Sequence, residues 1–290
     1  MKRVFVIILI TLSTINIVAQ KLKTDLLEMN LKDKVKSFTE NTSRVENSRA
    51  GESYVEIQTN YVFNDAGNKI EFNSYINNEL MEKTTYYYDI KGNKIKEKIS
   101  GLTDIFNYDN KNNLIEWSRF RENSLDFKHI YTYNSNGNLI EDKSSDGFLT
   151  TYSYDKNGNK TENAYYIWGK ALNYKKDLKH RITYKYDNNK NLIERNEYNP
   201  AESSFNQPAR NIVQSYKYDN KGNLVEEIEN GIKHFYKYDN YKNLIEETSN
   251  TSDDKTIYQY EYDKRMNWIK KIKLEGDRQT QVFERTYVYF

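Results

Sequence analysis

One short pattern recurs nine times along the chain and constrains its fold more than any other feature. The pattern reads aromatic-x-aromatic-Asp/Asn-x-x-Gly-Asn-x-Ile-Glu with small variations, and successive copies begin 20 to 32 residues apart. The copies begin at Tyr61, Tyr86, Phe106, Tyr131, Tyr152, Tyr184, Tyr216, Tyr236 and Tyr260. A unit this short cannot bury a core alone, so we expect the copies to stack into one continuous domain.

Each unit reads as a β-hairpin. In the seventh copy, Tyr216 and Tyr218 are two residues apart and therefore share one face of a strand. Asp219 begins a turn, because its carboxylate can accept backbone N–H groups two residues further on. Gly222 occupies the place where such a turn needs a positive φ, and Leu224 starts the returning strand.

The turn residues are expected to be structural. Clear examples are Asp89, Gly92, Asn93, Asp155, Gly158, Asn159, Asp219, Gly222 and Asn223. The Asn after the glycine position is present in all nine units, and hydrogen bonding within or between turns explains it more simply than a ligand. The glycine itself is replaced by Asn112, Lys190, Lys242 and Met266. Lys and Met tolerate a positive φ poorly, so we expect those three turns to differ or to carry strain.

A second set of turn signals lies midway between the motifs, as at Asn230-Gly231. Each unit then contributes two strands, which gives some 20 strands in an up-and-down meander. Residues 34–40 read as the returning half of a unit, and residues 286–290 as an opening half. A flat sheet of this width would expose its aromatic face. The sequence therefore predicts an all-β protein, a long antiparallel meander curled or spiralled into a barrel-like or shell-like ribbon.

The N-terminus has the features of a secretion signal. Lys2 and Arg3 precede an apolar run over residues 4–18, and Ala19-Gln20 resembles a cleavage site. The run is short and interrupted, which disfavours an uncleaved membrane anchor. We divide the chain into a signal peptide (1–19), a lead segment (20–33) and a repeat domain (34–290). The predicted location is the periplasm or the exterior. The protein is not expected to be a lipoprotein, because it has no cysteine.

The charge balance argues against a nucleic-acid partner. The chain has 44 Lys+Arg and 42 Asp+Glu, and Lys2 and Arg3 are the only charges within residues 1–20. The expected mature chain is therefore neutral, whereas nucleic-acid binders need a basic surplus. No membrane span is expected after signal removal. A transmembrane barrel is disfavoured because Lys233, His234 and Lys237 place polar groups on both faces of one strand.

The turn series resembles the YD repeats of the RHS (rearrangement hot spot) family over residues 34–290. The resemblance rests on Tyr88-Asp89-x-x-Gly92, Tyr154-Asp155-x-x-Gly158 and Tyr218-Asp219-x-x-Gly222. In that family Arg often follows the glycine, whereas here Asn does. The resemblance implies a ribbon of hairpins that spirals or closes, with roles in surface interaction, carbohydrate binding or encapsulation.

The sequence gives little sign of catalysis, and no cofactor or metal site is expected. There is no cysteine nucleophile, and His129, His180 and His234 lie far apart. Carboxylates recur at one motif position, which favours a solvated strand face over a glycosidase pair: Glu71, Glu116, Glu141, Glu162, Glu194, Glu226 and Glu246. A carboxylate-dependent glycoside-active enzyme stays as an alternative.

Recognition is expected where the repeat is interrupted. Two insertions, at residues 164–180 and 197–208, flank the sixth hairpin on the side of the midway turns, so they should be neighbours. They supply the candidate ligand-binding residues Tyr165, Tyr166, Trp168, Tyr174, Tyr198 and Phe205. Aromatic rings on loops can bind a glycan or anchor a surface protein. We therefore expect a binding or scaffold protein, with a purely structural shell or spacer as the alternative. The sequence leaves the oligomeric state open.

Overall fold

The structure is a computed structural model that describes residues 24–48, 51–169, 176–201 and 208–290. The predicted signal peptide lies outside these ranges. Apart from one four-residue helix, α1 (Asp25–Glu28), the regular structure is antiparallel strand. The strands are β1 (Val35–Ser48), β2 (Gly51–Phe63), β3 (Lys69–Ile76), β4 (Glu79–Tyr88), β5 (Lys94–Ile99), β6 (Leu102–Tyr108), β7 (Leu114–Arg121), β8 (Ser124–Tyr133), β9 (Leu139–Ser144), β10 (Phe148–Tyr154), β11 (Lys160–Ile167), β12 (Asp177–Tyr186), β13 (Leu192–Asn199), β14 (Arg210–Tyr218), β15 (Leu224–Glu229), β16 (Ile232–Tyr238), β17 (Leu244–Ser249), β18 (Ser252–Tyr262), β19 (Trp268–Glu275) and β20 (Arg278–Tyr289).

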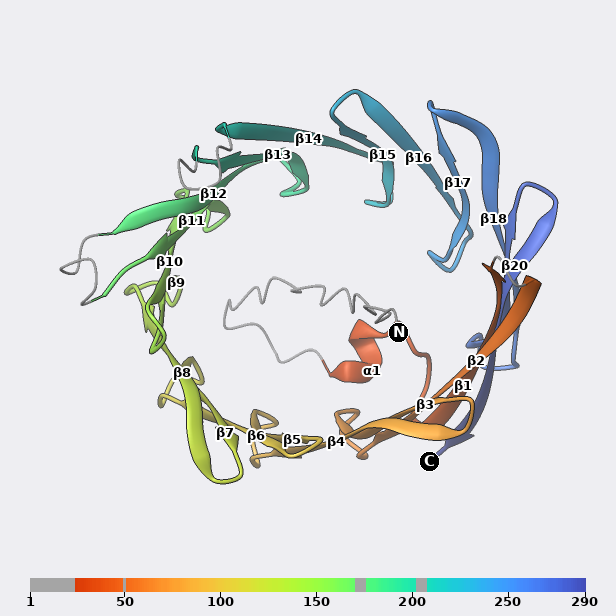
Figure 1. Cartoon of the computed structure of the whole chain (residues 1–290), viewed down its shortest axis with the longest axis horizontal. Coiled ribbons are helices and arrows are strands. Elements are labelled where there is room, and N and C mark those ends of the chain that lie inside the picture. The colour runs from red at the N-terminus through yellow and green to blue at the C-terminus, as the bar shows by residue number, and fades with distance from the viewer. Residues whose placement is uncertain (1–23, 49–50, 170–175, 202–207) are drawn as a thin grey trace.

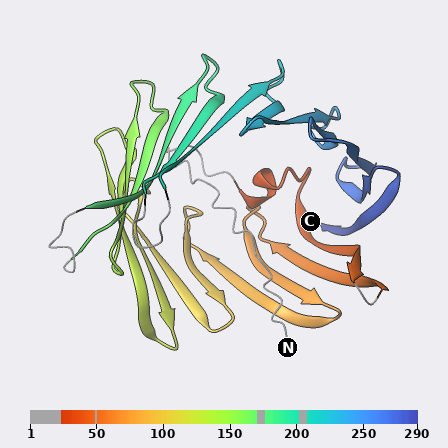
Figure 2. The same cartoon turned by 45° about the horizontal axis from the view of Figure 1, so that its top comes forward.

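The sheet closes on itself. Each strand pairs with the next along the chain, and β1 pairs with β20, so the 20 strands form a closed ring (Figures 1 and 2). The prediction of an all-β antiparallel meander that curls into a barrel is confirmed. Closure also removes the unpaired edges through which open sheets aggregate.

The two half-units at the ends of the repeat pair with each other. Tyr289 lies opposite Val35, and Tyr287 opposite Phe38. The Phe290 N–H donates to the Lys34 carbonyl at 3.0 Å. This bond corresponds to the one that closes each complete hairpin, such as Asp89 N–H to Asn93 O at 2.9 Å. β20 and β1 are therefore paired like the two strands of a tenth unit, but no turn connects them.

The motif tyrosines line the enclosed side of the barrel, which we call the lumen. Several of those at the third motif position donate their hydroxyl group to a backbone carbonyl of the preceding unit. The bonds are Tyr88 to Lys69 (2.7 Å), Tyr108 to Lys94 (2.9 Å), Tyr133 to Leu114 (2.7 Å), Tyr154 to Leu139 (2.8 Å) and Tyr186 to Lys160 (2.9 Å). Burial raises the pKa of Tyr108 to about 12. The tyrosines thus supply apolar surface while keeping their polar end bonded.

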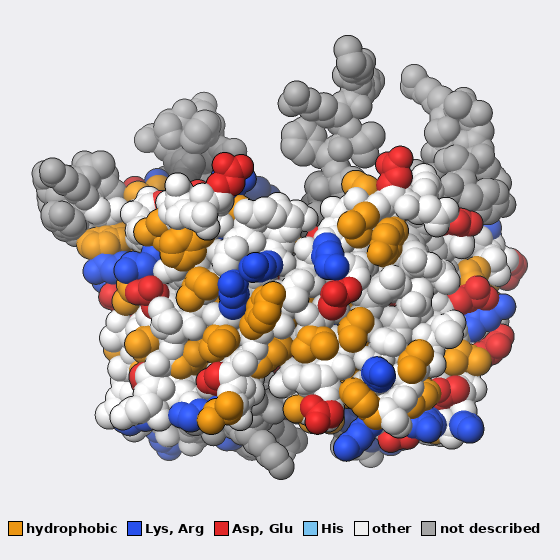
Figure 3. Space-filling view, turned by 90° about the horizontal axis from the view of Figure 1, so that it is seen from below, with side chains coloured by type: hydrophobic (Ala, Val, Ile, Leu, Met, Phe, Trp, Pro, Cys, Tyr) orange, Lys and Arg blue, Asp and Glu red, His pale blue; other side chains and the backbone are white. Residues whose placement is uncertain are grey.

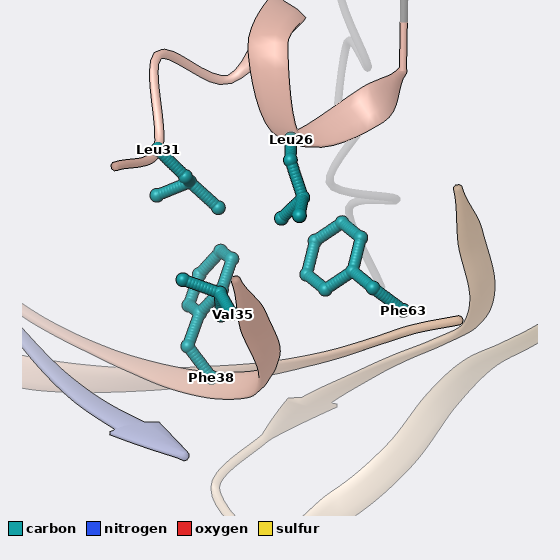
Figure 4. Close-up of a cluster of buried hydrophobic side chains, with 5 residues drawn as sticks. All are labelled: Leu26, Leu31, Val35, Phe38 and Phe63. Carbon is teal, nitrogen blue, oxygen red and sulfur yellow. The ribbon is translucent and has the colours of Figure 1, made fainter. Parts of the chain in front are cut away.

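One sector of the lumen contains the main apolar core. Helix α1 lies inside the ring against the first strands (Figure 1). Its Leu26 packs with Leu31, Val35, Phe38 and Phe63, each at most 8% exposed (Figure 4). The Leu26 N–H donates to the Gly67 carbonyl, and a side chain at Gly67 would approach Leu26 Cδ1 to 3.2 Å. The first motif turn therefore docks the helix directly.

The lead segment runs from the first motif turn to the last. At its start, Asp25 Oδ2 accepts the Lys69 N–H at 2.7 Å. At its end, the Asn267 amide exchanges two hydrogen bonds with the backbone of Lys32, at 2.7 and 2.8 Å. Arg265 pairs with Asp33 beside them. Residues 24–34 therefore link the first and last complete units across the β1–β20 seam.

The turns that lack glycine do not differ in backbone conformation, which corrects that part of the expectation. Lys190, Lys242 and Met266 have φ values of 66°, 67° and 64°, beside 80° at Gly158. The closing bonds are retained as well, for example Lys190 N–H to Asp187 O at 3.0 Å. The hydrogen bonds of the turn thus impose the left-handed backbone conformation. Lys190, Lys242 and Met266 adopt it at an energetic cost that glycine avoids.

The outer face of the barrel is charged and wet. Figure 3 shows one side of the wall, where cationic and anionic side chains alternate with small hydrophobic patches. No helix within the described ranges is long and apolar enough to cross a membrane.

Candidate functional site

Four of the six predicted ligand-binding residues lie within the described ranges, and the structure places them on two different faces of the sheet. Tyr165 faces the lumen, where its ring stacks on Phe148 with centroids 5.4 Å apart. Tyr166, Trp168 and Tyr198 lie on the outer face or at its rim. The backbone N–H of Trp168 donates to the Gly147 carbonyl (2.9 Å), and the Lys143 ammonium lies 4.0 Å from the Trp168 ring centroid.

The two remaining candidates, Tyr174 and Phe205, lie outside the described residues. The insertion ends do belong to neighbouring strands, because β11, β12, β13 and β14 are consecutive in the sheet.

A pocket on the outer face includes one predicted residue. It has a volume of about 330 Å³ and is lined by Arg181, Thr183, Asn196, Tyr198 and Asn211. These residues come from three adjacent strands: β12, β13 and β14. Tyr198 lies opposite Arg181 on one side and Asn211 on the other. The pocket is therefore a patch of outer sheet surface fixed by strand register.

The polar groups of this pocket are not bonded to one another. Within the described residues, the one interaction recorded among these side chains is the Arg181 guanidinium over the Tyr198 ring, 5.4 Å from its centroid. The Asn196 Oδ1 atom is buried and has no hydrogen-bond partner. Buried amide oxygens are normally bonded, so this atom marks an unmet requirement.

The opposite face of the same strands shows the contrast. There, Arg195 donates to Gln214 Oε1 at 2.7 Å and to Glu197 Oε2 at 2.5 Å. His180 Nε2 lies 3.0 Å from Glu197 Oε1. Burial alone would raise the pKa of Glu197, but its hydrogen bonds from Arg195 and Asn199 lower it below the ordinary value. On the lumen side Arg195 thus bonds to both Gln214 and Glu197, whereas His180 Nε2 on that side and Asn196 Oδ1 on the outer side are buried without a hydrogen bond within the described residues.

The recurring carboxylates lie on the outer face, where five of the seven pair with lysines within the described residues. Lys217 contacts Glu226 at 2.8 Å, and Lys237 contacts Glu246 at 2.7 Å. The three histidines all face the lumen, each near one carboxylate. His129 lies 2.6 Å from Asp142, and His234 lies 3.9 Å from Glu247. These are separate pairs along the wall rather than one cluster, since they lie on different hairpins.

The first residue of each motif turn braces its own hairpin through hydrogen bonds. In the second unit, Asp89 Oδ1 accepts the N–H groups of Lys91 and Asn93 at 2.9 Å, and Asp89 Oδ2 accepts the Asn93 amide at 2.9 Å. The Asn93 amide also lies 3.4 Å from Asn112 Oδ1 of the next turn. Each turn carboxylate is therefore occupied by its own hairpin.

Sequence reasoning missed four of the five pocket residues. Tyr198 was found because it borders an insertion, but Arg181, Thr183, Asn196 and Asn211 stand in strands and carry no motif. The pairing register of the strands was the one signal that could have identified these residues. Residues two apart in a strand share a face, so Arg181 with Thr183 and Asn196 with Tyr198 form two polar pairs beside each other.

The comparisons with known proteins bear on the repeat. A family model described as RHS Repeat matches residues 133–165. The chain contains an RHS repeat. This match runs from the end of β8 through most of β11 and includes the complete fifth motif, so the resemblance to the RHS and YD-repeat family is confirmed. No curated protein matched the chain.

Several solved structures are similar to this chain at low identity, with TM-scores below 0.5. The TcdB2-TccC3 complex without its hypervariable C-terminal region is 12% identical and has a TM-score of 0.43, with 86% of this chain and 16% of that chain covered. The Photorhabdus luminescens Tc holotoxin pore is 11% identical with a TM-score of 0.41, covering 80% and 14%. A porin-like protein from Bacteroides uniformis is 11% identical with a TM-score of 0.39, covering 89% and 99%.

The RHS repeat and the closed wall together describe a structural shell or scaffold module. Many of its described polar side chains serve the wall itself, as turn braces, outer ion pairs or lumen networks. This distribution indicates a structural rather than a catalytic role.

Proposed function

We propose that this chain is an exported RHS-repeat scaffold that binds a carbohydrate on its outer face. The observation that carries the proposal is the pocket over β12–β14, where Tyr198 stands beside three neutral polar side chains that have no hydrogen-bond partner within the described residues. Ligand sites combine an aromatic or apolar surface with a few convergent polar groups, and this pocket has that composition. Export rests on the predicted signal sequence.

The paired strands that carry the pocket form a rigid scaffold for it. The pocket lies on paired strands rather than on a loop, and sites built on regular elements hold their geometry well. The lumen face beneath the pocket is braced by Arg195, Glu197 and Gln214. The barrel therefore presents the outer groups at fixed spacings.

A glycan array with purified residues 20–290 tests the proposal. We expect a defined set of glycans to bind, and Tyr198→Ala to abolish that binding. Tyr87→Ala is the matched control, because Tyr87 is also an outer-face tyrosine beside a cation, Lys96, but lies away from the pocket. A blank array, or equal binding by both variants, contradicts the proposal.

A purely structural shell or spacer is the second candidate, favoured by the closed ring of strands. In this case the partner is another copy or a larger assembly. Light scattering separates the two, since a strict monomer removes the main support for the shell. An assembly that survives Tyr198→Ala and binds no glycan would favour it.

A further inference from the structure

The pocket over β12–β14 contains one positive charge, and a carboxylate on the same outer face, that of Glu162 of β11, lies opposite Thr183. Arg181 has no carboxylate partner within the described residues, and none of the other lining residues is acidic. Five other arginines do have such partners: Arg119 with Asp104, Arg121 with Asp126, Arg195 with Glu197, Arg265 with Asp33 and Arg285 with Glu40. An unpaired guanidinium beside a pocket is suited to a carboxylate, which it can bind through two parallel hydrogen bonds.

The neutral groups indicate what the rest of the ligand must offer. Thr183, Asn196 and Asn211 present hydroxyl and amide groups with no partner within the described chain. A ligand that fits must therefore both donate and accept hydrogen bonds at several points. Hydroxyl groups on a ring do this, whereas an aliphatic carboxylate does not.

The spacing of these groups sets the size of the ligand. Thr183 is two residues from Arg181 on one strand, or about 7 Å, and Asn211 is two strands away from Arg181, or about 10 Å. A phosphate ion could reach Arg181 but not the amides at the same time. The volume of about 330 Å³ also suits a small ring with substituents rather than a single ion.

We propose that this pocket recognises a sugar residue that carries a carboxylate, with Arg181 binding the carboxylate and Thr183, Asn196 and Asn211 binding the ring hydroxyls. This rests on the carbohydrate-binding function proposed above and assigns the chemical class of its ligand. Tyr198 lies between Arg181 and Asn211 on the central strand, and its ring packs against the guanidinium.

Calorimetric titration of residues 20–290 tests this assignment, with oligogalacturonate, the matching neutral galactose oligomer and inorganic phosphate as probes. We expect oligogalacturonate to bind at least about tenfold more tightly than the neutral oligomer, because hydrogen bonds to charged groups are the stronger ones. Added salt should reduce that preference, and phosphate should not compete at equal concentration.

Arg181→Gln should lower the affinity for oligogalacturonate about tenfold and leave the neutral oligomer unaffected. Lys185→Gln is the matched control, since Lys185 lies on the same strand but pairs with Glu194 at 2.7 Å. It should change neither affinity. Equal binding of the two oligomers, no effect of Arg181→Gln, or full displacement by phosphate would overturn the assignment while leaving carbohydrate binding intact. Failure of every sugar to bind would instead remove the proposed function.

Discussion

The wall around β1–β3 and the wall formed by β13–β17 follow the same repeat, yet only the first contains a buried core. Val35, Phe38 and Phe63 are at most 2% exposed, whereas no residue of β13–β17 is buried within the described ranges. The difference comes from α1 and the lead segment, which cover one sector of the lumen. In β13–β17 the repeat positions stay partly open, and hydrogen-bond networks take the place of apolar packing.

The difference between the two walls shows that the repeat forms a stable strand face whether or not another segment covers it. Tyrosine suits that task, because its ring packs against neighbouring strands while its hydroxyl can bond to a backbone carbonyl or to solvent. The same sequence pattern is then stable whether or not another segment covers it. Apolar residues such as Phe38 and Phe63 appear where a cover is present.

The largest expected difference between the walls lies in two aromatic residues at the same motif position. Phe63→Ala should destabilise the protein by about 3–5 kcal/mol, because it empties the core under α1. Tyr238→Ala on the opposite wall should cost about 1 kcal/mol, because its ring is only partly covered. Urea unfolding measures both changes. Equal losses would show that the lead segment does not create a separate core.

A smaller difference is expected at the turn asparagines. Asn267 is 3% exposed and bonds to the backbone of Lys32, whereas within the described residues Asn223 bonds to Asp219 of its own turn alone. Asn267→Ala should cost about 1–3 kcal/mol, since it leaves backbone groups of the lead segment without partners. Asn223→Ala should cost about 0.5–1.5 kcal/mol. If the two variants unfold at the same urea concentration, the lead segment is not linked to the last unit as described.

Much of this architecture can be predicted from the sequence. Pairs such as Tyr216 and Tyr218 give the strand face, and Asp219 with Gly222 gives the turn, because these effects act within a few residues. The number of strands and the inward tyrosine face follow. Ring closure does not, since the pairing of Tyr287 with Phe38 depends on the summed twist of the intervening strands.

The candidate site was predictable only in part, for a similar reason. Tyr198 stands out beside an insertion, but the pocket depends on which residues lie opposite it in β12 and β14.

Helix α1 was also not predicted, because residues 25–28 form a single turn that the contacts of Leu26 and Asp25 stabilise. An isolated helix so short is not stable without tertiary packing.

The turns on the opposite wall should improve when their strain is removed. Lys190→Gly and Lys242→Gly should each stabilise the protein by about 1 kcal/mol, because both residues hold a left-handed backbone that glycine adopts freely. Lys221→Gly is the control, since Lys221 precedes the turn glycine and does not have a positive φ. It should give no gain. Thermal unfolding compares the three variants, and a loss at Lys190 and Lys242 would contradict the assigned backbone conformation.

The smallest expected effect concerns pH. Hydrogen bonds from Asn159 lower the pKa of Asp155, and those from Asn223 lower the pKa of Asp219. A lowered folded pKa adds stability that is present above the unfolded value of about 4 and is lost as the pH falls through the folded value. Combined Asp155→Asn and Asp219→Asn should therefore flatten the stability profile below about pH 4.

The fourth unit shows that Asn can replace Asp at the turn-acid position. Asn134 occupies the turn-acid position of the fourth unit and accepts the N–H groups of Asn136 and Asn138 at 3.0 Å. The Asp-to-Asn variants should therefore fold normally at neutral pH. Asn134→Asp should have the opposite effect and steepen the loss of stability in acid. An unchanged acid profile in both directions would mean that the turn carboxylates do not contribute.

Closure of the ring at β1 and β20 is the central claim, and an engineered cross-link tests it most directly. Thr39 lies opposite Thr286 across the seam, and the chain has no cysteine that could interfere. Thr39→Cys with Thr286→Cys should form an intramolecular disulfide in the monomer, because paired strand residues meet the distance that a disulfide requires. Thr39→Cys with Val213→Cys, on another part of the wall, should not. Free thiols or only intermolecular cross-links in the first variant would show that the ribbon stays open.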